Sequence, residues 1–190
     1  MRVLVGCEHS GIIREAFASL GHDAWSCDLL PTEQPGNHIQ DDIRKVVIQH
    51  KWDLAIFHPP CTYLARCGAR WMNEERHQLQ QEAIEFALFL WAAPIPKVCI
   101  ENPVGVLRHH LGHAQIIHPW MFGHGETKKT ALWIRGLPWL SPTNIVNGRS
   151  DRIHKVPERK DRWKIRSRTY PGIAEAMAQQ WGGKVEISNH

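Results

Sequence analysis

The sequence WDLAIFHPPC spans residues 52–61, and the sequence KVCIENP spans residues 97–103. Each begins with a mostly apolar run, residues 52–57 and 97–100, and then changes abruptly to polar residues and proline. Short apolar runs that are bounded in this way predict buried β-strands. Residues 74–93, which lie between them, have the spacing of a long amphipathic helix. A strand, a helix and a second strand in this order predict two parallel strands joined by a crossover helix.

The same alternation extends toward the N-terminus. Residues 2–7 and 23–27 predict two further strands, and residues 11–20 and 43–50 predict two further helices. Ser10 is a candidate N-cap for the first of these helices, and Gly21 ends it. We therefore expect a Rossmann-like α/β fold, with a mostly parallel sheet and helices on both faces. Ligands of such folds bind at the carboxyl ends of the strands, so the polar residues at those ends are the candidates for function.

The pattern weakens after Pro103. Residues 130–134 predict a strand, residues 171–181 predict a helix that stops at Gly182, and residues 184–187 predict a last strand. No change of composition marks a domain boundary. We expect a single domain, residues 1–190, in which residues 103–168 form either a small substrate-binding subdomain or a basic extension.

The composition, with 43% hydrophobic and 22% charged residues, predicts a soluble globular protein. No apolar run approaches the ~18 residues that span a membrane, so no membrane contact is expected. The chain opens without a secretory signal pattern, and five cysteines without a CxxC pair argue against a disulfide framework. We expect a cytoplasmic protein. The thirteen histidines come without the cysteine or carboxylate spacing of a zinc site, so no metal is expected.

The positive charge is concentrated in one segment. The chain has a net charge of +4, whereas residues 151–168 hold eight Lys and Arg against three acidic residues. This segment therefore carries +5, and the rest of the chain sums to −1. A concentrated basic segment suits a polyanionic partner such as nucleic acid. The alternative is a solvated basic linker.

Cys61 and Glu101 are the two strand-end residues with the most distinctive chemistry. Cys61 follows two prolines, which stiffen the backbone and remove two amide donors, and Glu101 stands two residues before Pro103. If the two strands are neighbours, the thiol and the carboxyl group face one cleft. A thiolate beside a carboxylic acid suits covalent catalysis on an electron-poor ring. A buried cysteine with a packing role is the alternative.

The residues HPPC at 58–61 and IENP at 100–103 resemble the paired motifs of the cytosine-C5 DNA methyltransferases. In that family a Pro-Cys turn supplies the nucleophile, and a Glu-Asn pair follows at the next strand end. The resemblance implies a Rossmann-like S-adenosylmethionine-dependent methyltransferase fold and a catalytic set of Pro60, Cys61, Glu101 and Asn102. It implies that the Cys61 thiolate adds to cytosine C6, with Glu101 hydrogen-bonding or protonating N3.

The resemblance also implies S-adenosylmethionine as cofactor. Residues 5–11, VGCEHSG, are similar to the family's cofactor-binding loop, and residues 169–178 are similar to its closing motif. The expected cofactor-binding residues are Glu8, His9, Ser10, Gly11, Asp28, Asp42, Ile43, Pro59 and Thr169. The loop departs from the family pattern, because Glu8, His9 and Ser10 occupy its second glycine-rich step.

DNA is the partner that the resemblance implies. The chain is similar to the short methyltransferase-like proteins of phages and prophages, which lack a large target-recognition domain. The expected nucleic-acid-binding residues are Arg66, Arg70, Lys128, Lys129, Arg166 and Arg168, with Trp71 and Trp163 as candidates for stacking on bases. Residues 164–168, KIRSR, match the family's Gln-x-Arg-x-Arg strand in part. A methyltransferase of single-stranded nucleic acid or a free nucleotide, and a non-catalytic nucleic-acid-binding module, are the rival hypotheses.

Overall fold

The computed structural model describes residues 1–190 except 66–72, 156, 158–161 and 184–190. The described strands form one seven-stranded sheet in the order β3-β2-β1-β4-β5-β7-β6. Their bounds are β3 (His38–Gln40), β2 (Asp23–Asp28), β1 (Arg2–Gly6), β4 (Leu54–Phe57), β5 (Lys97–Pro103), β7 (Thr130–Arg135) and β6 (Gln115–Ile117). The first five strands run parallel, and β7 runs antiparallel to both β5 and β6.

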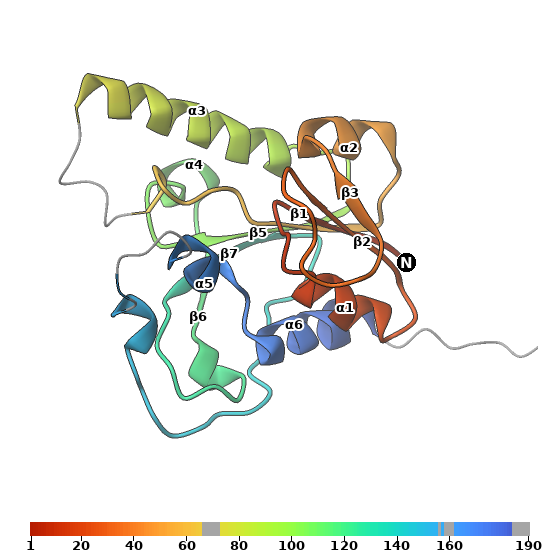
Figure 1. The fold of residues 1–190 in the computed structure, drawn as a ribbon, viewed down its shortest axis with the longest axis vertical. Helices are drawn as coiled ribbons and strands as arrows, with labels where there is room; N and C mark the ends of the chain where they lie inside the picture. The colour runs from red at the N-terminus through yellow and green to blue at the C-terminus, as the bar shows by residue number, and fades with distance from the viewer. Residues whose placement is uncertain (66–72, 156, 158–161, 184–190) are drawn as a thin grey trace, which may run out of the picture.

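Helices cover both faces of this sheet (Figure 1). One face carries α2 (Ile43–Gln49), α3 (Glu74–Trp91) and α4 (Arg108–Leu111). The other carries α1 (Ile12–Ala18) and α6 (Pro171–Met177), which continues as a π-helical turn over Ala178–Gly182. The short helix α5 (Arg162–Ser167) lies in front of the strand ends (Figure 1). Residues 164–167, which were matched to part of a Gln-x-Arg-x-Arg strand, are therefore helical, and that part of the match is wrong. The predicted Rossmann-like α/β fold, with a mostly parallel sheet and helices on both faces, is therefore confirmed.

The strands alternate their side chains between two hydrophobic cores. In β4, Ala55 and Phe57 belong to the core under α2 and α3, whereas Leu54 and Ile56 belong to the core under α1 and α6. Successive residues of a strand point to opposite faces, so a strand with a helical layer on both sides must be apolar throughout. This requirement explains the continuous apolar runs that marked the central strands in the sequence.

The predicted boundaries need three corrections. The strand expected over residues 97–100 continues as β5 through Pro103, because residues 101–103 pair with β7. The N-cap of α1 is Gly11, with a φ of 76°, and not Ser10. The short strands β3 and β6 were not predicted, and the strand expected over residues 184–187 lies outside the described residues.

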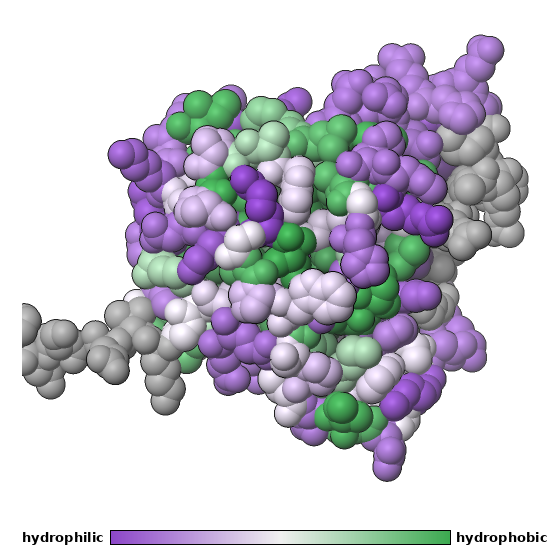
Figure 2. Space-filling view, turned by 180° about the vertical axis from the view of Figure 1, so that it is seen from behind, coloured by the Kyte–Doolittle hydropathy of each residue, from purple (hydrophilic) through white to green (hydrophobic). Residues whose placement is uncertain are grey.

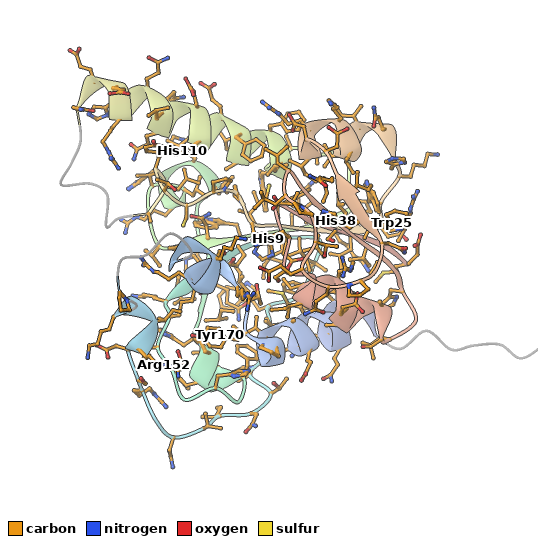
Figure 3. The ribbon with its side chains drawn as sticks, viewed as in Figure 1. His9, Trp25, His38, His110, Arg152 and Tyr170 are labelled. Atoms are coloured by element: carbon orange, nitrogen blue, oxygen red, sulfur yellow. The ribbon has the colours of Figure 1, made fainter. Side chains whose placement is uncertain are left out.

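The surface gives little direct indication of a binding site. Seen from behind, hydrophobic side chains lie in separate groups among hydrophilic ones (Figure 2). The most exposed large hydrophobic residues are 62–72% exposed and come from four segments: Leu29, Ile48, Trp139 and Ile145. Across the described parts of the chain, the helices are too short or too polar to cross a membrane. His9, which follows β1, is buried, and in the view of Figure 3 its label lies between those of His38 and Arg152.

Candidate active site

Cys61 begins a tight turn directly after β4. The strand ends at Phe57, and His58, Pro59 and Pro60 lead to the exposed Cys61. The carbonyl oxygen of Cys61 accepts hydrogen bonds from the backbone N–H groups of Leu64 (3.1 Å) and Ala65 (3.0 Å). The two prolines restrict the backbone on the other side of the thiol. Cys61 is therefore held on a stiff segment at the carboxyl edge of the sheet.

Asn102 joins this turn to the neighbouring strand β5. Its side chain is buried, and Nδ2 donates a hydrogen bond to the carbonyl oxygen of Pro59 (2.7 Å). A second connection follows shortly after β5 ends, where the N–H of Val106 donates to the carbonyl oxygen of Leu64 (3.0 Å). The Cys61 turn is thus fixed to the β5 end by a side chain and by backbone.

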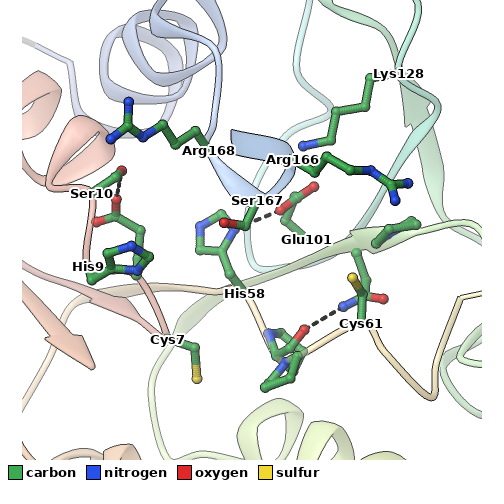
Figure 4. Close-up of a pocket in the computed structure, with 15 residues that line it drawn as sticks. Cys7, His9, Ser10, His58, Cys61, Glu101, Lys128, Arg166, Ser167 and Arg168 are labelled. Atoms are coloured by element: carbon green, nitrogen blue, oxygen red, sulfur yellow. Dashed lines mark hydrogen bonds and ion pairs between the residues drawn. The ribbon is translucent and has the colours of Figure 1, made fainter. Parts of the chain in front are cut away.

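Cys61 and Glu101 line one cavity of about 110 Å³ (Figure 4). Asn102, Pro59 and Pro60 also line it, so every residue of the expected catalytic set lies at this place. The parallel register of β4 and β5, with Phe57 opposite Ile100, brings the two strand ends together. The cavity can hold a small planar group between a thiol and a carboxyl group.

His58 is a functional candidate that the sequence interpretation missed. Its Nδ1 lies 2.7 Å from Oε2 of Glu101, and the two side chains are only 10% and 13% exposed. Burial raises the pKa of Glu101, but the hydrogen bond from His58 and the nearby charges of His58 and Lys128 lower it more, so the carboxyl group is held ionised. The signal was present, since His58 stands at the same strand end that singled out Cys61.

A second cavity of about 300 Å³ adjoins the first and shares Cys7 and Pro60 with it. Asp28, at the end of β2, and Asp42, at the start of α2, both line it, together with the apolar Ile43. Asp42 is the N-cap of α2 and pairs with Arg44 at 2.6 Å, which lowers the pKa of the Asp42 carboxyl group. This cavity combines carboxylates with apolar walls, as a nucleoside would require.

The loop after β1 crosses between the two cavities. Cys7 has a φ of 58°, in the left-handed region that disfavours side chains, and it lines both cavities. Glu8, His9 and Ser10 are buried and line the smaller cavity. One carboxylate oxygen of Glu8 accepts from the Ser10 hydroxyl group, while Oε2 is buried without a hydrogen-bond partner among the described residues. Glu8 is thus prepared for a cationic or hydrogen-bonding ligand.

The buried Arg14 stabilises this loop indirectly, through the segment that contains Glu33, Gln34 and Pro35. Arg14 donates hydrogen bonds to the Ser26 hydroxyl group (2.8 Å) and to the carbonyl oxygens of Gln34 (2.9 Å) and Pro35 (2.8 Å). The segment that Arg14 holds carries Glu33, whose N–H donates to the carbonyl oxygen of His9 (2.8 Å). Of the other expected cofactor residues, Gly11 and Thr169 line neither of these two cavities.

Three of the expected nucleic-acid-binding residues line the cavity that holds Cys61: Lys128, Arg166 and Arg168. Arg168 also pairs with Glu33 at 2.5 Å. Lys129 is exposed and does not line this cavity. Arg66, Arg70 and Trp71, the side chain of Trp163, and residues 156 and 158–161 of the basic segment lie outside the part of the chain that the structure describes.

The other described cysteines have a different environment from Cys61. Cys27 and Cys99 are buried, and burial raises the pKa of both thiols, to about 12 for Cys27. Burial also raises the pKa of Cys7. These thiols are poor sources of thiolate. Among the described residues, no group of three or more His, Cys, Asp and Glu could hold a metal ion.

No protein-family model and no curated protein matches the chain. Among solved structures, the chain is similar to a protein described as a DNA modification methyltransferase encoded within a prophage (E. coli), with a TM-score of 0.47 and 15% identity over 76% of this chain and 51% of that chain. It is also similar to the S. pombe Dnmt2 methyltransferase, with a TM-score of 0.46 and 15% identity over 82% of this chain and 53% of that chain. The chain thus spans about half the length of these two structures.

Proposed function

We propose that this protein transfers a methyl group from S-adenosylmethionine to C5 of cytosine in DNA, through a covalent bond between Cys61 and cytosine C6. The observation that carries this proposal is the pair of adjoining cavities. One brings the exposed Cys61 and the buried Glu101 together, and the other, acidic cavity shares Cys7 and Pro60 with it. A cytosine bound beside Cys61 in the first cavity and a methyl donor bound in the second would meet beside Cys7 and Pro60, which line both.

The larger cavity suits the adenosine part of the cofactor. Asp28 stands at the end of β2, where Rossmann-like folds place an acid for the ribose hydroxyl groups. Asp42 and Ile43 would contact the adenine, and the unpartnered Oε2 of Glu8 would accept from the ammonium group of the methionine part. When bound, S-adenosylmethionine supplies an electrophilic methyl group on its sulfonium.

The chemistry assigned to the chain's own residues starts with Cys61. Its thiolate adds to C6, which makes C5 nucleophilic enough to accept a methyl group. Glu101 faces the charge that this addition places on ring nitrogen N3. Asn102 holds the Cys61 turn through its hydrogen bond to Pro59. A water molecule then takes the C5 proton, the C5–H electrons form the C5–C6 double bond, and the Sγ–C6 bond breaks, which releases the Cys61 thiolate and restores the aromatic ring.

DNA is the proposed substrate because Lys128, Arg166 and Arg168 gather at the same cavity. They fit phosphates that flank a cytosine, and a cytosine within a duplex must leave its base stack to reach Cys61. Residues 103–168, which contain all three, are the proposed substrate-binding part of a single domain. A single-stranded or mononucleotide substrate would use the same cations.

The proposal is tested by incubating the protein with methyl-labelled S-adenosylmethionine and duplex DNA, single-stranded DNA or dCMP, and by mapping 5-methylcytosine at base resolution. We expect label at cytosine C5 in duplex DNA. The Cys61→Ser variant should transfer none, and Cys67→Ser serves as the matched cysteine control. Label on an exocyclic nitrogen would contradict the proposed chemistry, label in dCMP alone would change the substrate class, and DNA binding without transfer would favour a non-catalytic module.

A further inference from the structure

We infer that His58 is a second proton-handling residue of this site: together with Glu101 it holds the proton that cytosine N3 takes when Cys61 adds to C6. The inference rests on the proposed function and extends it to a residue outside the Pro-Cys and Glu-Asn pairs. The evidence is the geometry of His58 and the charges around it.

The backbone itself sets the pairing of His58 with Glu101. Phe57 and Ile100 are register partners in the parallel strands β4 and β5, so His58 and Glu101 are the next residues on neighbouring strands. Their side chains meet at 2.7 Å, and each is close to nine-tenths buried. A carboxylate can only accept hydrogen bonds, so the proton between them belongs to Nδ1 of His58. The pair is a fixed part of the cavity wall (Figure 4).

The other ring nitrogen of His58 has no such partner. Nε2 is buried without a hydrogen-bond partner among the described residues, although His58 lines the cavity. A buried polar atom without a partner costs about 1–3 kcal/mol, and native structures rarely leave one. An unpartnered nitrogen in a cavity wall therefore indicates that a ligand, a substrate or a water molecule supplies the missing hydrogen bond.

The charges near the pair favour an ionised Glu101. Burial raises the pKa of Glu101, but His58 and Lys128 lower it more. The titratable and charged groups that line the same cavity are Cys7, Glu8 and His9 after β1, Cys61 after β4, Lys128 before β7, and Arg166 and Arg168 in and after α5. An ionised Glu101 has no proton of its own to give to N3. His58 is the residue in direct contact that can supply one, in its imidazolium form with a proton on each ring nitrogen.

The proton that the pair gives to N3 returns to the pair within one turnover. The donor is the imidazolium form of His58, with a proton on each ring nitrogen: as the bond between Cys61 Sγ and C6 forms, the Nδ1–H bond breaks, Glu101 passes the proton on, an N3–H bond forms, and His58 is left neutral with its proton on Nε2. After methyl transfer a water molecule takes the C5 proton, the C5–H electrons form the C5–C6 double bond, the Sγ–C6 bond breaks, and the N3 proton returns through Glu101 to His58. The pair therefore ends each turnover in the state in which it began.

This arrangement predicts a distinctive pH profile. Adduct formation on this account requires the proton that the pair passes to N3, so its rate should fall as pH rises. In His58→Gln the amide can still donate a hydrogen bond to Glu101, but only Glu101 can then supply the proton. The alkaline limb should therefore move to lower pH by about 1–2 units, toward the range in which carboxyl groups titrate.

The experiment measures the rate of covalent trapping on DNA that contains 5-fluorocytosine, at a series of pH values and with S-adenosylmethionine present. It compares wild type, His58→Gln and His58→Asn with His113→Gln, a control at an exposed histidine that does not line the cavity. Urea unfolding of each variant separates folding from chemistry. A shifted limb in both His58 variants, with an unchanged profile in the control, is the expected result.

Two results would overturn the inference, and they are distinguishable. A His58→Gln profile that is lower at every pH but keeps its limb, or one that equals wild type, would make His58 only a structural residue. No adduct with wild-type protein at any pH would instead overturn the proposed function, and the proton role of His58 with it.

Discussion

Replacement of Gly105 by alanine should displace the Cys61 turn. An alanine Cβ at this position would lie 1.8 Å from the carbonyl oxygen of Leu64 and 3.0 Å from Cα of Ala65. Both are backbone atoms, so no side-chain rotation can relieve the clash. To reach even 3.0 Å from the Leu64 oxygen, the two segments must separate by about 1.2 Å. Leu64 belongs to the turn that begins at Cys61, so the nucleophile moves with it.

The size of the effect follows from this displacement. A shift of about 1 Å in a reacting group can reduce a rate by about 10²-fold. Forcing an extra methyl group into a packed site costs about 1–3 kcal/mol of stability. We therefore expect Gly105→Ala to remain folded but to form the fluorocytosine adduct about 100-fold more slowly.

The assay is the rate of adduct formation, with urea unfolding and calorimetric binding of S-adenosylmethionine measured in parallel. Gly112→Ala is the matched control, because a Cβ there meets no atom within 4 Å although the φ is 76°. It should lose about 1–3 kcal/mol through backbone strain and keep its rate. A Gly105→Ala protein that forms the adduct at the wild-type rate would refute the claim that the close approach of Gly105 to Leu64 sets the position of Cys61.

Two other changes test separate parts of the site, and a third tests a charge outside both cavities. Asp28→Ala should weaken S-adenosylmethionine binding by about 1.5–3 kcal/mol in calorimetry, and unchanged affinity would remove Asp28 from the cofactor site. The double replacement of Lys128 and Arg166 by alanine should reduce the slope of log affinity for DNA against log salt by about 0.9 for each phosphate that is no longer neutralised, whereas an equal slope would argue against a role for these cations in phosphate binding. Burial raises the pKa of Glu126, but hydrogen bonds from Tyr170 and Arg152 lower it below its ordinary 4.5, so its contribution to stability should be present above that pH and be lost as pH falls through the lowered value. Urea unfolding at about pH 6 and about pH 3 should show a smaller difference in Glu126→Gln than in wild type, and equal differences would contradict this.

The central part of the fold could be predicted because its strands are buried on both faces. The apolar residues of β1 and β4 and the first half of β5 are required by the helical layers on either side. The strands β3 and β6 were missed because three residues are too few to show a period. The extension of β5 through Pro103 was missed because its partner β7 is distant along the chain.

The direction of one strand explains why only one of two adjacent lysines lines the cavity. Lys128 and Lys129 were both expected to bind nucleic acid, and nothing in a local pattern shows whether a strand runs parallel or antiparallel. Because β7 is antiparallel, Thr130 at its start faces Pro103 at the end of β5. This pairing brings the residues just before β7 to the same edge as Glu101, and Lys128 is the one that lines the cavity.

The pairing of His58 with Glu101 shows a second limit of prediction from sequence alone. Histidine beside proline is compatible with an ordinary turn, and its role depends on which residue stands opposite on the next strand. That register is set by the packing of whole strands and is invisible in either motif alone. The motif residues could be predicted one by one, but not the way in which one side chain sets the charge of another.

Covalent trapping tests the central claim most directly. The protein is incubated with S-adenosylmethionine and DNA in which target cytosines carry fluorine at C5, and the products are separated under denaturing conditions. Fluorine cannot leave as a proton, so a thiolate that has added to C6 remains attached. We predict a complex that resists denaturation, requires S-adenosylmethionine and is absent in Cys61→Ser. A Cys61→Ser protein that still methylates cytosine C5 would contradict the account.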